Sequence, residues 1–179
     1  YGYTLDDNAR ALIVATKHYK LYKDEHSLKL INTYLDSISY VQQPDGKLLN
    51  LINYRKDVSE FSDDAHGRGL WALGYLMSVP EIAPILKERA QHIFNKAINA
   101  TDKITSPRAV AFIILGLYFY QQVNPSSENK DKISNFANHL VSLYRDNVSP
   151  EWQWFEGSLS YSNSKLPEAL LYAYLATEK

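Results

Sequence analysis

The sequence predicts an all-α fold of about seven helices, paired as antiparallel hairpins that form an inner and an outer layer. Segments that are apolar on every side alternate along the chain with segments that carry one apolar stripe at helical spacing, as enclosed and surface helices do. In addition, each enclosed segment opens with polar residues and then a cation, namely Arg10, Arg68, Arg108 and Lys165. If the enclosed helices run parallel, the four cations lie at one face of the fold.

Length and composition indicate one globular domain, residues 1–179, with 45% hydrophobic residues to form a core. The formal net charge of −1 argues against binding to nucleic acid or an anionic membrane, since both need a basic surface. No apolar run approaches the roughly 20 residues that span a bilayer, so we expect no membrane insertion. The absence of cysteine excludes disulfides and thiolate metal sites without separating cytoplasm from periplasm; of these we favour the cytoplasm.

The first hairpin consists of an enclosed helix over 8–22 and an amphipathic outer helix over 26–41. Residues 42–62 then lack helical periodicity and contain the turn sequence Pro44-Asp45-Gly46. A loop of this length in a compact domain is usually functional. Within it, we expect residues 48–54 to form a short hairpin.

The middle of the chain predicts three more helices. Residues 64–77 form an enclosed helix in which Arg68 falls in the first turn, where a cation is unfavourable and needs an anionic partner. Residues 80–99 are amphipathic and begin at a first-turn proline. Residues 108–121 have no polar face at their centre, which predicts the most buried helix.

The last part of the chain predicts an amphipathic outer helix over 127–145 and an enclosed helix over 164–176. A second long loop, residues 146–163, connects them and carries several aromatic residues. Both long loops therefore lead from an outer helix to the N-terminus of an inner one.

Four segments carry a resemblance to a known family: residues 3–12, 63–74, 106–112, and 152–156 with 161–167. They are similar to the motifs of bacterial α/α-toroid (six-hairpin glycosidase-like) proteins of carbohydrate metabolism, of the kind described as glycosyltransferase-associated or glycosidase-like. The resemblance implies a partial α/α toroid, and an oligosaccharide or polysaccharide as ligand. The last segment departs from the family pattern, with Ser162 in place of an acid and Lys165 in place of an arginine.

The family's domain usually continues for a comparable length, so the resemblance implies that this chain is the N-terminal half of a toroid. An open toroid leaves inner helices uncovered and exposes an apolar flank. We expect a homodimer or the remainder of the parent toroid to cover this flank.

Acid doublets precede two of the enclosed helices, Asp6-Asp7 and Asp63-Asp64. Such acids commonly cap the helix or pair with arginine. Glycosidic cleavage also needs two carboxyls that flank the bond, and one member of each doublet is free for this task. We choose Asp7 and Asp64 as catalytic candidates.

A third catalytic candidate is Glu156, which lies among aromatic residues in the second long loop. Desolvation there would raise the pKa of its carboxyl, as a general acid requires. The nearby Trp152, Trp154 and Tyr161 either stack on sugar faces or fill the mouth of the toroid.

The remaining candidates bind substrate through planar or charged side chains. They are Arg10, Asp63, His66, Arg68, Arg108 and Asn163. His66 has no second histidine at metal-ligand spacing, so we expect a hydrogen bond to a sugar hydroxyl or to Asp63 instead. We expect no metal and no cofactor, since no phosphate-binding or dinucleotide-binding motif is present.

Two functions remain open. One is a carbohydrate-active domain that binds and cleaves glycosidic bonds by carboxylate general acid/base catalysis. The other is a non-catalytic sugar-binding or scaffolding domain associated with a glycosyltransferase or another carbohydrate enzyme. Two opposed carboxyls in an open groove favour cleavage, whereas acids that are all paired with arginine favour a structural role.

Overall fold

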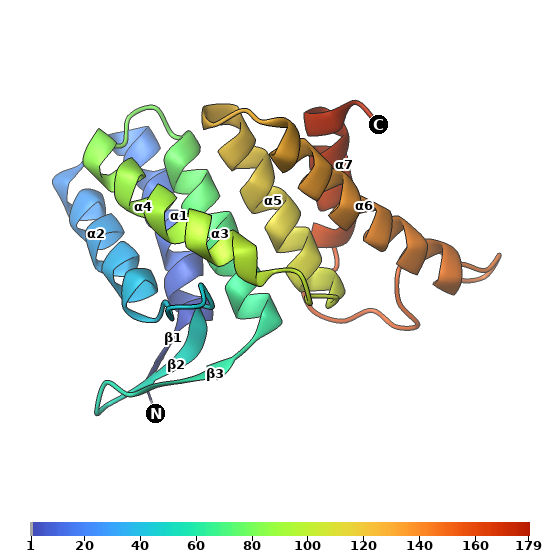
Figure 1. Ribbon diagram of the computed structural model, residues 1–179, viewed down its shortest axis with the longest axis horizontal. Coiled ribbons are helices and arrows are strands. Elements are labelled where there is room, and N and C mark those ends of the chain that lie inside the picture. Colours follow the sequence, from blue (N-terminus) through green and yellow to red (C-terminus); the bar gives the residue numbers. More distant parts are fainter. Residues whose placement is uncertain (1) are drawn as a thin grey trace.

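The computed structural model describes residues 2–179, which form seven α-helices, a short 3₁₀ helix and a small sheet (Figure 1). Each of the seven expected segments is a helix. The helices are α1 (Leu5–Tyr22), α2 (Glu25–Tyr40), α3 (Asp63–Ser78), α4 (Pro84–Ala97), α5 (Pro107–Val123), α6 (Ser127–Asn147) and α7 (Lys165–Thr177), with the 3₁₀ helix at Ile98–Ala100. No helix of residues 2–179 has both the length and the apolar character needed to cross a membrane.

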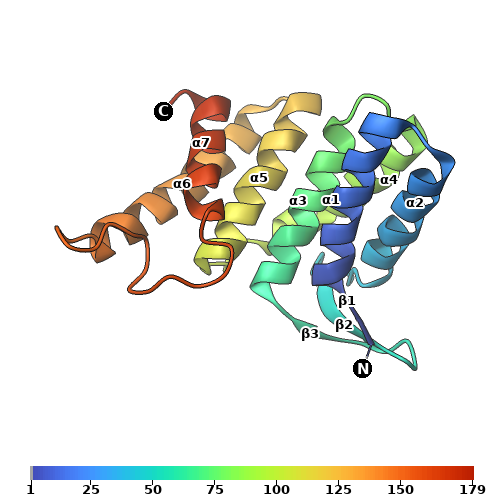
Figure 2. The same cartoon turned by 180° about the vertical axis from the view of Figure 1, so that it is seen from behind.

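The helices form two layers. Helices α1, α3, α5 and α7 stand side by side in one row (Figure 2), and each contacts the next. Helices α2, α4 and α6 cover the other face of this row (Figure 1). The four helices of the row run in the same direction, so their N-termini meet at the end where the sheet and the second long loop lie.

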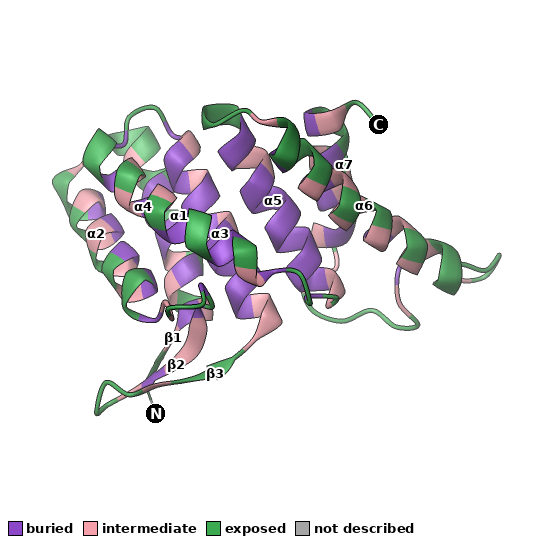
Figure 3. Ribbon diagram, viewed as in Figure 1, coloured by how far each residue is buried: buried purple, intermediate pink, exposed green. Residues whose placement is uncertain are grey.

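The helices in the middle of the row are more buried than those at its ends. Helices α3 and α5 are buried along most of their length, whereas α1 and α7 each expose one side (Figure 3). The expectation that α1 and α7 are enclosed is therefore wrong for this chain, because each has a row neighbour on one side only. The uncovered sides carry the expected apolar residues, namely Val14, Leu21 and Tyr22 on α1 and Leu171, Tyr174 and Leu175 on α7.

Capping residues make α1 and α3 begin earlier than the sequence indicated. Thr4 caps α1 by accepting a hydrogen bond from the Asp7 backbone N–H (3.1 Å), and Ser62 caps α3 through the N–H of Ala65 (3.3 Å). Both acid doublets consequently lie in first turns. The sequence had indicated that Arg68 lies in the first turn of α3, but it lies in the second turn.

The fourth helix also begins later than expected. Its first helical residue is Pro84, and Pro80 lies in the turn before it.

The sheet has three antiparallel strands in the order β1 (Gly2–Thr4), β2 (Leu49–Asn53) and β3 (Val58–Phe61). The expected hairpin over 48–54 is wrong in its position, because the hairpin spans 49–61. The side-chain oxygen of Asn53 accepts hydrogen bonds from the backbone N–H groups of Arg55 (2.8 Å) and Asp57 (3.0 Å). These bonds fix the turn after β2, and the pairing of β2 with β1 places β2 beside the start of α1.

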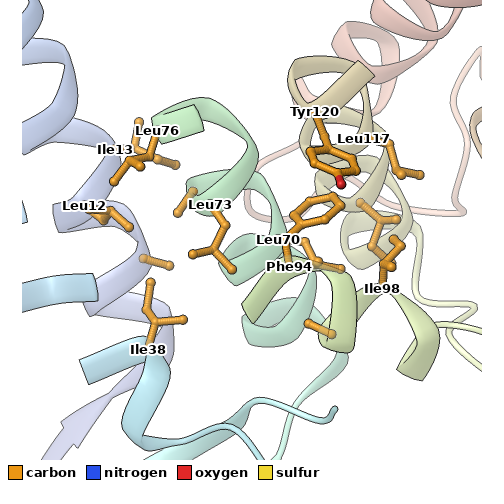
Figure 4. Packing of buried hydrophobic residues seen from close by; sticks show 14 of the residues in the cluster. Leu12, Ile13, Ile38, Leu70, Leu73, Leu76, Phe94, Ile98, Leu117 and Tyr120 are labelled. Carbon is orange, nitrogen blue, oxygen red and sulfur yellow. The ribbon is translucent and has the colours of Figure 1, made fainter. Parts of the chain in front are cut away.

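The most extensive helix contact joins α3 to α5, and glycines permit it. A Cβ at Gly74 would lie 2.3 Å from the carbonyl oxygen of Gly116, and one at Gly116 would lie 2.7 Å from the backbone of Leu70. Around this contact, Leu70 and Leu73 of α3 join the apolar core that Figure 4 shows. Two rigid backbones thus touch where any larger residue would separate them.

We predict that Gly116→Ala lowers the free energy of unfolding by about 2 to 3 kcal/mol, since the clash with the α3 backbone outweighs the better helix propensity of alanine. Urea unfolding measures the change. Gly157→Ala is the matched control, because no atom lies within 4 Å of a Cβ there. Equal stabilities for the two variants would show that the helices can separate at little cost.

Candidate functional site

A cavity of about 350 Å³ opens at the N-termini of α1 and α3. We call it the N-terminal cavity. Its lining residues come from the end of β1, from α1, from β2, from α3 and its cap, and from the second long loop: Thr4, Asp6, Asp7, Arg10, Asn50, Ser62, Asp64, Ala65, Arg68 and Tyr161. Five residues singled out in the sequence meet here, namely Asp7, Arg10, Asp64, Arg68 and Tyr161.

Asp6 forms an ion pair with each of the two arginines of the cavity. One oxygen forms an ion pair with Arg10, and the other lies 2.5 Å from the Nε of Arg68. The anionic partner that the sequence required for Arg68 is therefore Asp6, the doublet member that we did not select. The selected member, Asp7, accepts a hydrogen bond from the Thr4 hydroxyl (2.8 Å). It also lies 3.5 Å from Arg10, and 73% of its side chain is exposed.

Arg68 lies at the floor of the cavity with only 8% of its side chain exposed. Its guanidinium carbon stands 4.2 Å from the centre of the Phe112 ring, a cation–π distance. The contact with Asp6 lacks hydrogen-bond geometry, so the buried Nε of Arg68 has no hydrogen-bond partner within residues 2–179. A buried arginine has five donors to satisfy, so donors remain available in the cavity.

Asp64 lies in the same cavity and links three elements. One oxygen accepts a hydrogen bond from Ser106 at the start of α5 (2.8 Å), and the other accepts one from the Tyr161 hydroxyl. Burial and this hydrogen bond to Asp64 raise the pKa of Tyr161 to about 12. Tyr161 is consequently a neutral donor at pH 7, and it ties the second long loop to α3.

Arg108 anchors the same loop from behind the cavity. It donates to both carboxylate oxygens of Glu156 (2.9 and 2.8 Å), to the side-chain oxygen of Asn163 (3.1 Å) and to the backbone oxygen of Tyr161 (2.5 Å). The hydrogen bonds to Glu156 are the main cause that raises the pKa of Arg108. Because these protein acceptors occupy its donors and it is absent from the cavity lining, this arginine is a structural anchor.

The catalytic expectation for Glu156 does not fit this geometry. We expected a desolvated carboxyl that is free to donate a proton, but both of its oxygens accept hydrogen bonds from Arg108. Glu156 also lies outside the cavity lining. Its partner is 48 residues away in the sequence, so neighbouring residues gave no sign of it.

Trp152, Trp154 and Asn163 likewise lie outside the cavity lining. Trp152 donates its indole N–H to the backbone oxygen of Glu156 (2.6 Å), and Trp154 packs edge-on against Phe155. Asn163 donates back to Ser160 and accepts from Arg108. These contacts hold the loop together, which is the space-filling role that the sequence left open, and Tyr161 is the aromatic residue of the cavity.

His66 is fully buried below the site, so the expected hydrogen bond to a sugar or to Asp63 is wrong. Its Nδ1 accepts the backbone N–H of Leu48 (3.1 Å), and Nε2 lies 3.1 Å from the backbone oxygen of Ala97. Nε2 therefore carries the proton and donates. Burial lowers the pKa of His66 to about 4, and the neutral ring joins the first long loop to the end of α4.

Asp63 points into a different cavity, of about 400 Å³, beside Asp45, Lys47 and Asp102. The two acids of the α3 doublet thus face separate spaces. Within residues 2–179, no group of three or more side chains has the arrangement of a metal site.

No family model fits this sequence, and no curated protein matches it. The relation to the α/α-toroid proteins therefore rests on the four sequence segments and is a proposal.

We predict that acid destabilises the protein through His66. The pKa of His66 is about 4 when folded and about 6.5 when unfolded, so the unfolded state binds more protons between these values and stability falls as the pH falls. At pH 5 the loss is about 2 kcal/mol relative to pH 7. Urea unfolding at both pH values measures it. His66→Gln retains a donor and an acceptor without the titration, and an equal loss in this variant would contradict the assignment.

Proposed function

We propose that the N-terminal cavity binds a saccharide and that the chain is a sugar-binding domain. One observation carries the proposal: a single cavity combines carboxylate acceptors (Asp7 and Asp64), a guanidinium with donors to spare (Arg68) and the ring of Tyr161, which is 58% exposed. Sugar hydroxyls both donate and accept hydrogen bonds. Planar charged groups and an aromatic face are suited to holding such a ring.

We also propose that the two-layer arrangement is part of an α/α toroid. The parallel inner row and its convergent N-termini support this reading. So do the apolar residues exposed on α1 and α7 at the two ends of the row. Further hairpins, or a second copy of the chain, would cover these surfaces and close a ring.

Glycoside hydrolysis is the second candidate. It is favoured by the presence of Asp7 and Asp64, from two different helices, in one cavity, because cleavage needs two carboxyls that flank the bond. However, both oxygens of Asp64 accept hydrogen bonds from protein hydroxyls, and Asp7 is largely in water. Asp7 also forms an ion pair with Arg10 (3.5 Å), and the other acids, Asp6 and Glu156, are paired with arginine as well. Binding without cleavage therefore agrees better with the geometry, as in a domain that serves a glycosyltransferase or another carbohydrate enzyme.

A glycan array followed by calorimetry tests the proposal. We predict that Asp64→Asn lowers the affinity for the bound glycan about tenfold or more, since a hydrogen bond to a charged acceptor contributes about 1.5 to 3 kcal/mol. Asp63→Asn is the matched control, because the neighbouring acid faces the other cavity, and its affinity should not change.

Two results would contradict the proposal. One is the absence of any bound glycan; the other is an equal effect of the two substitutions. Release of reducing sugar that disappears in Asp7→Asn would establish hydrolysis in place of binding alone.

A further inference from the structure

We infer that the N-terminal cavity selects a sugar ring that carries no acidic group, with Arg68 as the donor that holds two neighbouring oxygens of that ring. This inference rests on the proposed function and specifies its ligand. Two independent observations carry it, namely the unfilled donors of Arg68 and the charge balance of the cavity lining.

The first observation concerns Arg68. Its side chain is more than nine-tenths buried, lines the cavity and packs its guanidinium on Phe112. Its Nε has no hydrogen-bond partner among the described residues, and its contact with Asp6 is an ion pair, so the free protein leaves donors of this guanidinium to water or to a ligand. The guanidinium fork presents parallel N–H groups, and the two oxygens of a vicinal diol match this arrangement.

The second observation concerns charge. The lining holds three carboxylates, those of Asp6, Asp7 and Asp64, and two guanidiniums, those of Arg10 and Arg68, which gives a net charge of −1. The surrounding charges do not change this sign, because Arg108 is paired with Glu156 and Lys165 with Glu168, and Tyr161 is neutral. The adjoining cavity also has more acids than cations in its lining, namely Asp45, Asp63 and Asp102 against Lys47 and Lys103.

These two observations together disfavour the binding of acidic sugars. A carboxylate or phosphate could also bind the guanidinium of Arg68, but Arg68 and Arg10 already face the carboxylates of Asp6 and Asp7. The added anion would then face Asp7 and Asp64 without a free cation. Hydroxyl groups meet no such cost, since they accept from Arg68 and donate to Asp64 or Asp7.

Matched glycans test the selection. Oligosaccharides of glucose, galactose and mannose are compared with the same oligosaccharides after oxidation of their C6 hydroxyls to carboxylates, by ligand-observed NMR and calorimetry. We predict that the neutral form binds at least fivefold more tightly. Equal or tighter binding of the oxidised form would overturn the inference and leave sugar binding itself intact, whereas no binding of either form would remove the proposed function.

Substitutions test whether the charge of the cavity lining, and not its shape, sets the preference for the neutral glycan. Asp7→Asn makes the cavity lining neutral, so the preference for the neutral glycan should narrow at least threefold, while Asp131→Asn, an exposed acid on α6, leaves the preference unchanged. An unchanged preference in Asp7→Asn would show that charge does not set it.

Arg68→Lys keeps the positive charge beside Asp6 but lacks the fork. Binding of the neutral glycan should weaken at least tenfold. The circular dichroism spectrum and the Tm of the variant establish that it is folded. Full affinity in a folded Arg68→Lys protein would contradict the role given to Arg68.

Discussion

The close approach of α3 and α5 at their glycines is the constraint on which the rest of the structure depends. With Gly74 against Gly116 and Gly67 against Ala109, the two backbones meet along their length. Their N-terminal ends are therefore held side by side. This position brings Asp64 to Ser106 and Arg68 over Phe112, so the packing of two apolar helices determines the geometry of a polar cavity.

Two arginines on these helices perform different tasks at the same end of the fold. Arg108 on α5 is satisfied by Glu156, Asn163 and the backbone of Tyr161, and it fixes the second long loop. Arg68 on α3 has the Asp6 carboxylate beside it but retains donors for a ligand. Tyr161 stands between the two, since its backbone meets Arg108 while its hydroxyl meets Asp64. The loop thus completes the cavity with an aromatic ring whose position is set from two sides.

Local sequence patterns predicted the helices and the end of the fold where the cavity lies, because periodicity, caps and charges are local signals. Contacts between distant segments were not predictable in this way. The pairing of Glu156 with Arg108, the burial of His66 beneath Leu48 and Ala97, and the sheet that joins β1 to β2 all link residues far apart in the chain. For the acid doublets, the sequence predicted that one member of each faces a ligand. Only the structure shows which cavity Asp63 and Asp64 each face.

The central claim is that a neutral sugar ring occupies the N-terminal cavity. A crystal of the protein soaked with mixed neutral oligosaccharides tests it most directly. The account predicts electron density for a sugar ring beside Tyr161, with two of its oxygens within hydrogen-bond distance of Arg68 and one of Asp64 or Asp7. An empty N-terminal cavity in such a crystal, with sugar bound only in the groove between Tyr3, Tyr40 and Tyr54, would contradict it.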